Sequence, residues 1–80
     1  MAYHLKRIKK GKIGKFSKIR EEYQELKDAH EQKDNILEIC ELTDLIGAIE
    51  EYSKKKHNLD LNDLIRFSNK TKKAFKENKR

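Results

Sequence analysis

The chain has 80 residues, 42% of them charged, and a formal net charge of +6, which limits it to one small domain. The apolar residues fall in periodic blocks, so the pattern predicts a folded helical chain and excludes a disordered one. The single cysteine, Cys40, excludes an internal disulfide and a cysteine-built zinc site, and it favours a reducing cytoplasm. No apolar run approaches the roughly 20 residues of a membrane span, so we expect no membrane partner.

The charge is distributed in three parts. Residues 1–20, 21–52 and 53–80 carry net charges of +8, −9 and +7. Basic flanks around an acidic centre suit either a nucleic acid or an anionic ligand that is held over metal ions. The charge pattern alone leaves both alternatives open.

The first elements are an arm and a helix. Residues 1–14 contain two of the three glycines and the run KRIKKGK, which is typical of an extended basic arm. A helix is predicted from about Phe16 to about Gln32, because apolar and aromatic residues recur there at helical spacing. We expect His30 to lie at the edge of this helix as a packing residue.

Two further helices follow. Asn35 with Glu38 has the spacing of a capping box and begins a helix that continues to about Lys56. The turn HNL follows, and Asp60 with Asp63 begins the third helix. We therefore expect an all-α domain over residues 15–78, a small bundle of about three helices. A core of this size is marginal, so we expect a homo-oligomer, either a dimer or a tetramer, to complete it.

The second helix carries acids within an apolar surface. Its apolar residues cover most of the helix circumference, so it is predicted to be buried nearly all round. Glu41 and Asp44 share one narrow stripe with Ala48 and Glu51 at about 100° per residue. Ionised carboxylates enter a core only when they are paired or hold a metal, so something must compensate them.

The first helix offers a matching pair of acids. Glu22 and Glu25 lie beside the apolar stripe with Ala29, whereas Glu21 points further from it. Two facing pairs of carboxylates would repel each other strongly without a cation. Mg²⁺, or Mn²⁺ as an alternative, prefers such oxygen ligands and keeps positions for water and phosphate. A solvated acidic face is the competing interpretation.

The two acidic motifs resemble those of a known enzyme family. REEYQEL contains Glu21, Glu22 and Glu25, and ELTD, fifteen residues later, contains Glu41 and Asp44. This resembles the EExxE…ExxD signature of the MazG-like all-α nucleotide pyrophosphohydrolases. The resemblance implies cleavage of a nucleoside triphosphate to the monophosphate and pyrophosphate, with Mg²⁺ as cofactor. It implies that Glu22, Glu25, Glu41 and Asp44 bind the metal. It further implies that Glu21 and Glu22 are catalytic, Glu21 by orienting or deprotonating the attacking water.

The resemblance covers residues 16–75 and also concerns the third helix. The family places basic residues on the helix after ExxD, where this chain has NKTKKAF. Asn69, Lys70 and Lys73, with Lys72, are therefore the candidates for binding the triphosphate. A solvated lysine face explains any one of them equally well. The chain is short for the family and lacks a full fourth helix, so the nucleotide pocket is expected to depend on a neighbouring subunit.

Two other functions remain open on the sequence. The first is a small basic helical module that binds nucleic acid or inhibits a partner without catalysis, using the basic flanks. The second is a catalytically inactive relative that is kept as an interaction protein. The first alternative leaves the carboxylates of the second helix unexplained, and the intact acidic motifs argue against the second.

Overall fold

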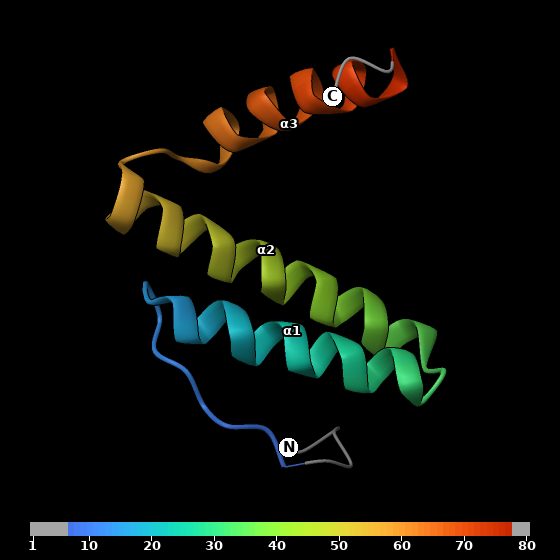
Figure 1. Cartoon of the computed structure of the whole chain (residues 1–80). Coiled ribbons are helices and arrows are strands. Elements are labelled where there is room, and N and C mark those ends of the chain that lie inside the picture. The colour runs from blue at the N-terminus through green and yellow to red at the C-terminus, as the bar shows by residue number, and fades with distance from the viewer. Residues whose placement is uncertain (1–6, 78–80) are drawn as a thin grey trace.

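The computed structural model describes residues 7–77, and this part of the chain contains helices and no strand (Figure 1). The helices are α1 (Phe16–Glu31), α2 (Asn35–His57) and α3 (Leu61–Lys76). They form a small all-α bundle, which confirms the predicted fold class. Residues 1–6 of the predicted arm and residue 78 of the predicted domain lie outside the described residues.

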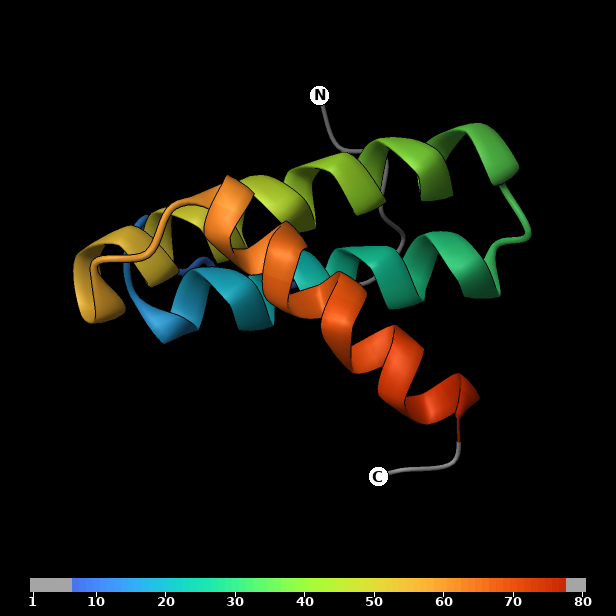
Figure 2. The ribbon, with the colours of Figure 1, turned by 90° about the horizontal axis from the view of Figure 1, so that it is seen from above.

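Helices α1 and α2 form an antiparallel hairpin, side by side in two perpendicular views (Figures 1 and 2). Their connection is short, and Asp34 caps α2 by accepting a hydrogen bond from the Leu37 N–H at 3.0 Å. The predicted Asn35–Glu38 capping box is therefore wrong by one residue, because an aspartate stands immediately before Asn35 and provides the cap. Glu38 instead contacts His30 of α1, with 2.9 Å between Oε1 of Glu38 and Nδ1 of His30. The His30 side chain is exposed, so this contact joins the two helices on their outer surface.

The start of α3 agrees with the prediction. The Asp60 side chain accepts from the Asp63 N–H at 2.8 Å, and the Asp63 side chain accepts from the Asp60 N–H at 3.1 Å. This is a complete capping box. The preceding turn ends α2 at Asn58, whose φ of 57° is a left-handed conformation that asparagine tolerates well. From this turn α3 runs at an angle away from the hairpin (Figures 1 and 2).

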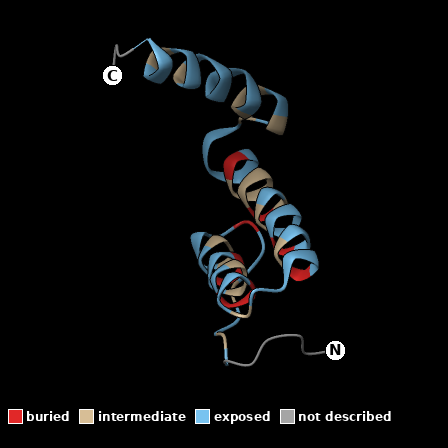
Figure 3. Ribbon diagram, turned by 90° about the vertical axis from the view of Figure 1, so that its right-hand side faces the viewer, coloured by how far each residue is buried: buried red, intermediate tan, exposed pale blue. Residues whose placement is uncertain are grey.

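The interior of the hairpin contains more acids than large apolar side chains. Among the described residues, the buried apolar ones are Ala29, Leu37 and Ala48, and no large side chain is fully buried. Buried acids from both helices accompany them, and Figure 3 shows that the buried positions of the hairpin lie largely where α1 and α2 face each other. The buried acids are Glu21, Glu22, Asp28 and Glu41.

The apolar face of α2 points outward, contrary to the prediction that this helix is buried nearly all round. Ile36 is 79% exposed and Ile39 is 62% exposed, and Leu42 and Ile46 are also exposed. The side of α2 that carries Glu41 packs on α1, so much of the apolar side is left uncovered by the described residues. A hollow of about 210 Å³ separates part of this face from α3 and is lined by Ile46, Ile49, Leu61, Leu64, Ile65, Ser68, Asn69 and Lys72.

The described part of the arm, residues 7–14, and Lys15 after it have no regular secondary structure, and the arm is held against α1 by hydrogen bonds. The Gly11 N–H donates to Glu21 at 2.8 Å, and the Lys12 N–H donates to the Ser17 hydroxyl at 3.1 Å. A Cβ at Gly11 would lie 2.2 Å from the Ser17 carbonyl oxygen, so only glycine allows this close approach. None of the helices described is long and apolar enough to cross a membrane.

Candidate metal centre

Four carboxylates from α1 and α2 converge between the two helices. One oxygen each of Glu22, Glu25, Glu41 and Asp44 lies within 4.8 Å of the others. Each helix contributes a pair with i, i+3 spacing, which places both members on the same face. The structure thus brings together the four residues that the sequence singles out as metal ligands.

The cluster spans the boundary between the interior and the solvent. Glu22 and Glu41 are each 5% exposed, Glu25 is half-buried and Asp44 is exposed. The expectation that both Glu41 and Asp44 are buried therefore holds only for Glu41. Asp44 lies at the solvent-exposed edge of the cluster. An ion in the cluster would keep access to solvent and to a ligand on that side.

The electrostatics of the cluster are those of like charges brought close together. Burial raises the pKa of Glu22, and the nearby Glu25 carboxyl, close enough to share a proton, raises it further. Burial also raises the pKa of Glu25, and the Glu41 carboxylate adds to this effect. Without a cation, Glu22 and Glu25 therefore hold protons more tightly than ordinary glutamates do.

Oε2 of Glu22, an oxygen of the cluster, lacks a hydrogen-bond donor among the described residues. Oε1 of Glu22 accepts from Lys18, but no N–H or O–H of the described residues reaches Oε2, which is buried. A buried carboxylate oxygen without a donor is costly, and a cation at this position would compensate it. The donor set consists of carboxylate oxygens alone, which suits a hard divalent cation such as Mg²⁺ or Mn²⁺. The residues therefore fit the cofactor that the sequence predicts.

Lys18 forms ion pairs with both Glu22 of the cluster and its neighbour Glu21. Its ammonium nitrogen lies 3.1 Å from Oε1 of Glu21 and 3.1 Å from Oε1 of Glu22. Burial alone lowers the pKa of Lys18, but hydrogen bonds to the two carboxylates outweigh that effect and raise it. The ammonium is therefore charged at neutral pH and offsets part of the negative charge. The sequence analysis did not single out Lys18, although its i, i+3 and i, i+4 spacing to the two acids contains this signal.

Glu21 is buried and is held by the arm. Its carboxylate accepts from the Gly11 N–H and from Lys18, and the Lys10 ammonium lies 3.5 Å away. Burial raises the pKa of Glu21, but these partners more than compensate and leave the pKa lowered. A lowered pKa makes this carboxylate a weak base. Its predicted role in orienting or deprotonating water stays a prediction.

An open hollow of about 490 Å³ lies beside the cluster. It is lined from the arm, α1 and α2, and two of its lining residues, Lys18 and Thr43, were not predicted from the sequence. Gly47 also lines it, and a Cβ there would meet no atom within 4 Å. The remaining lining residues are Ile13, Glu22, Asp44, Ala48, Glu50 and Glu51.

The candidate substrate-binding residues of α3 lie elsewhere. Asn69 lines the hollow between α2 and α3, on the apolar side of α2. Lys70 and Lys73 are exposed on α3. No described residue of α3 lines the hollow beside the carboxylates, so a substrate there would reach these side chains only from a second subunit. Their role stays a prediction.

Comparison of the chain with protein-family models, with curated proteins and with solved structures gave no match. The function is therefore inferred from the geometry of the site and from the motifs in the sequence.

Proposed function

We propose that the protein is a Mg²⁺-dependent nucleoside triphosphate pyrophosphohydrolase, which produces a nucleoside monophosphate and pyrophosphate. The observation that carries this proposal is the convergence of four carboxylates from two helices within 4.8 Å. Their motifs resemble those of the MazG-like pyrophosphohydrolases, and the open hollow of about 490 Å³ lies beside them. The combination suits a metal site that is open to a phosphate ligand.

The roles of the residues follow from their chemistry. Glu22, Glu25, Glu41 and Asp44 would hold the cation between α1 and α2. When bound, Mg²⁺ neutralises phosphate charge and lowers the pKa of water. Lys18 lines the hollow and is positively charged, so it would contact an anionic phosphate oxygen.

Glu21 would fix the position of Lys18. It is held in turn by the Gly11 N–H of the arm. The arm thus supports the side of the site on which the phosphates would lie. Glu22 keeps its candidate catalytic role as the acid of the cluster that forms an ion pair with this lysine.

The proposed enzyme is a homo-oligomer, a dimer or a tetramer. The hairpin buries few apolar side chains, while α2 and α3 expose Ile36, Ile39, Phe67 and Phe75. Association of the apolar faces would cover this surface. It would also allow Asn69, Lys70 or Lys73 of one subunit to approach the carboxylates of another.

We also place the enzyme in the cytoplasm. The thiol of Cys40 is free and exposed, which suits a reducing compartment.

The activity is tested by the identity of the product. Incubation with Mg²⁺ and a panel of canonical, deoxy and modified nucleoside triphosphates should release pyrophosphate and the monophosphate. Release of orthophosphate would contradict the proposed α–β cleavage. Glu22→Gln, Glu25→Gln, Glu41→Gln and Asp44→Asn should each remove nearly all turnover.

The matched control is Glu31→Gln, which neutralises an exposed acid at the end of α1, away from the cluster. It should leave turnover close to the wild-type value. Wild-type turnover in all four cluster variants would show that the reaction takes place elsewhere. Lys70→Ala and Lys73→Ala should mainly raise KM, as expected for residues that bind the substrate.

A further inference from the structure

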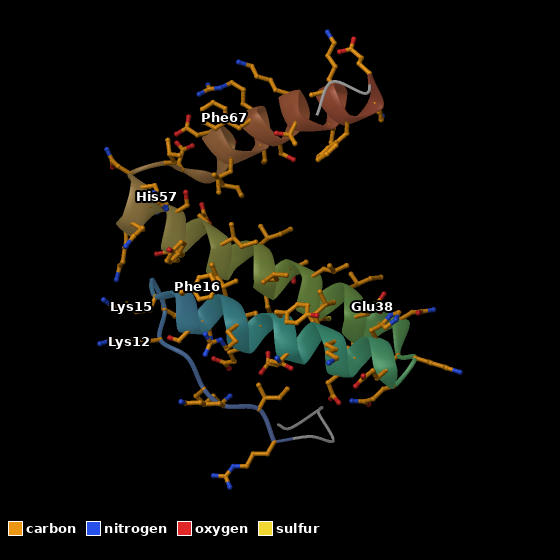
Figure 4. The ribbon with its side chains drawn as sticks, viewed as in Figure 1. Lys12, Lys15, Phe16, Glu38, His57 and Phe67 are labelled. Atoms are coloured by element: carbon orange, nitrogen blue, oxygen red, sulfur yellow. The ribbon has the colours of Figure 1, made fainter. Side chains whose placement is uncertain are left out.

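The end of the hairpin where the arm meets α2 carries a second concentration of charge, opposite in sign to the metal centre. A hollow of about 380 Å³ is lined there by Gly14, Lys15, Phe16, Tyr52, Lys55 and Lys56. Lys12 lies next to it, and Figure 4 shows the side chains of Lys12 and Lys15 pointing to the same side. We call Lys12, Lys15, Lys55 and Lys56, together with Phe16 and Tyr52, the basic end.

The lysines of the basic end are not neutralised by acids of the described residues. Among residues 7–77, no carboxylate forms an ion pair with any of the four. No acidic residue lines the hollow. Other lysines of the chain have acidic partners, such as Lys18 with Glu22 and Lys54 with Glu51. The basic end therefore presents an uncompensated positive surface.

The fold explains only half of these lysines. Lys55 and Lys56 lie in the last turn of α2, where cations interact favourably with the helix dipole. Lys15 is the N-cap of α1, at the positive end of that dipole, where it provides no side-chain cap and no acid occupies the first turn. A cation is unfavourable at this end of a helix, and an anion is favourable. An anionic ligand would compensate this arrangement.

The arm holds these lysines in place before any ligand arrives. Gly14 has a φ of 85°, a left-handed conformation that favours glycine. The side chain of Lys55 packs against it, since a Cβ at Gly14 would lie 2.5 Å from Cδ of Lys55. The Lys15 N–H donates to the Lys12 carbonyl at 2.9 Å, which closes a turn between the two arm lysines. The charges of the arm and of α2 are thus brought together across about 40 residues of sequence.

Aromatic rings lie among the lysines. Phe16 is exposed and meets Tyr52 edge-to-face with 5.9 Å between ring centroids. Tyr52 meets His57 in the same manner, also at 5.9 Å. An exposed ring between cations is an arrangement that binds single-stranded nucleic acid, because a base stacks on the ring while lysines contact the phosphates. A duplex would offer its phosphates but not its base faces.

We infer that the basic end binds single-stranded nucleic acid without sequence preference. Phosphates contact Lys12, Lys15, Lys55 and Lys56, and a base stacks on Phe16. The interaction is independent of the proposed hydrolysis, because none of these residues belongs to the carboxylate cluster. It requires no divalent cation.

The test is fluorescence anisotropy with a labelled oligothymidylate of about 15 nucleotides in EDTA. The wild-type protein should bind it, and the affinity should fall by at least about tenfold between about 50 and 200 mM salt. The double variant Lys15→Glu, Lys55→Glu should bind at least about tenfold more weakly. The matched control Lys27→Glu, Lys33→Glu makes the same change in net charge at the opposite end of the hairpin. Its affinity for the oligonucleotide should stay within about twofold of the wild-type value. Equal losses in both variants would overturn the assignment of the site.

Two further measurements separate the strand from other anions. Phe16→Leu keeps an apolar side chain but removes the ring, so it should weaken oligothymidylate binding by about fivefold or more. It should leave the binding of inorganic polyphosphate unchanged. If both ligands weaken equally, or if anionic phospholipid vesicles bind and the oligonucleotide does not, the inference is wrong. Lys15→Arg, Lys55→Arg should retain binding, and circular dichroism should confirm that each variant is helical.

Discussion

Lys18 forms an ion pair with Glu22 at 3.1 Å, on the edge of the carboxylate cluster. The Lys18 side chain is 24% exposed and the Glu22 side chain only 7%, so the contact is largely shielded from solvent. Lys18 is the cation that the chain itself supplies to a group of acids that repel one another. Lys18 therefore couples the stability of the hairpin to the charge of the carboxylates and to the binding of a metal ion.

Replacing Lys18 by methionine should lower the free energy of unfolding of the metal-free protein by about 1–3 kcal/mol. The variant keeps the apolar stem but leaves the buried carboxylates without their cation. Urea denaturation in EDTA measures the effect. Mg²⁺ should stabilise this variant more than the wild type, because the ion then replaces a missing charge. Lys54→Met, which removes a cation from a more exposed pair with Glu51, should change stability by less than about 1 kcal/mol. Equal effects of the two substitutions would contradict the role given to Lys18.

Mg²⁺ or Mn²⁺ should raise the melting temperature of the wild-type protein. A ligand that binds only the folded state stabilises it by about 2.7 kcal/mol at a concentration of 100 times its Kd. Glu41→Gln should abolish most of this rise, whereas Glu31→Gln should preserve it. The Glu41 substitution should also stabilise the metal-free protein, because it removes one of the repelling charges. Thermal unfolding followed by circular dichroism provides both measurements, and a wild-type protein indifferent to both ions would refute the metal site.

The metal-free protein should lose stability as the pH rises above the ordinary pKa of glutamate, 4.5. The pKa values of Glu22 and Glu25 are raised in the folded state, mainly by burial and by neighbouring carboxylates. The folded state therefore binds more protons than the unfolded state between the ordinary and the raised pKa values. The lowered pKa of Glu21 changes stability mainly below pH 4.5, so it does not oppose this trend at higher pH.

The pH effect is measured by urea denaturation in EDTA from about pH 5 to about pH 7. Stability should fall across this range in the wild type and fall less in Glu25→Gln. Saturating Mg²⁺ should remove the decline, because the cation favours the ionised carboxylates. A rise in stability with pH in EDTA would contradict the shifted pKa values.

Gly47→Ala should stabilise the helix and obstruct the site. Alanine in a helix interior is favoured over glycine by about 0.5–1 kcal/mol, and the added Cβ meets no atom of the chain within 4 Å. The methyl group extends into the hollow beside the carboxylates, so KM for the triphosphate should rise. Melting curves and steady-state kinetics measure the two effects. A lower melting temperature would instead indicate that another subunit covers position 47.

The protein should be a dimer or tetramer at micromolar concentration. The exposed isoleucines of α2 each gain about 1.5–3 kcal/mol on full burial, which favours association of this face. Ile39→Lys should shift the equilibrium towards smaller species, whereas Lys27→Glu should not. Light scattering that gave 9.6 kDa for the wild type would contradict this expectation.

The sequence predicts the helices well because their boundaries are set by local interactions. The Asp60–Asp63 capping box and the start at Phe16 agree with the structure. The start of α2 at Asn35 was predicted correctly, but its N-cap was misread, because Asp34 and Asn35 are both good caps and only the backbone decides between them. Spacing also identified the four clustered acids, since i, i+3 pairs on two packed helices have few ways to face each other.

The burial of α2 could not be predicted from its sequence. Apolar residues and acids both occupy faces of this helix, and the pattern does not reveal which face meets α1. The structure places Glu41 inside and Ile36 outside, which inverts the usual order. The role of Lys18 was missed for a related reason. Its i, i+3 and i, i+4 spacing to Glu21 and Glu22 is visible in the sequence, but it marks a functional lysine only once those acids are known to be buried.

The small interior of the hairpin has a consequence for every solution measurement. Only Ala29, Leu37 and Ala48 are buried among the apolar residues described, so in the proposed oligomer much of the stabilising burial would come from contacts between chains. Folding and assembly would then be governed by mass action, and dilution would favour unfolding. Melting temperatures and activities should rise with protein concentration, and variants should be compared at one concentration.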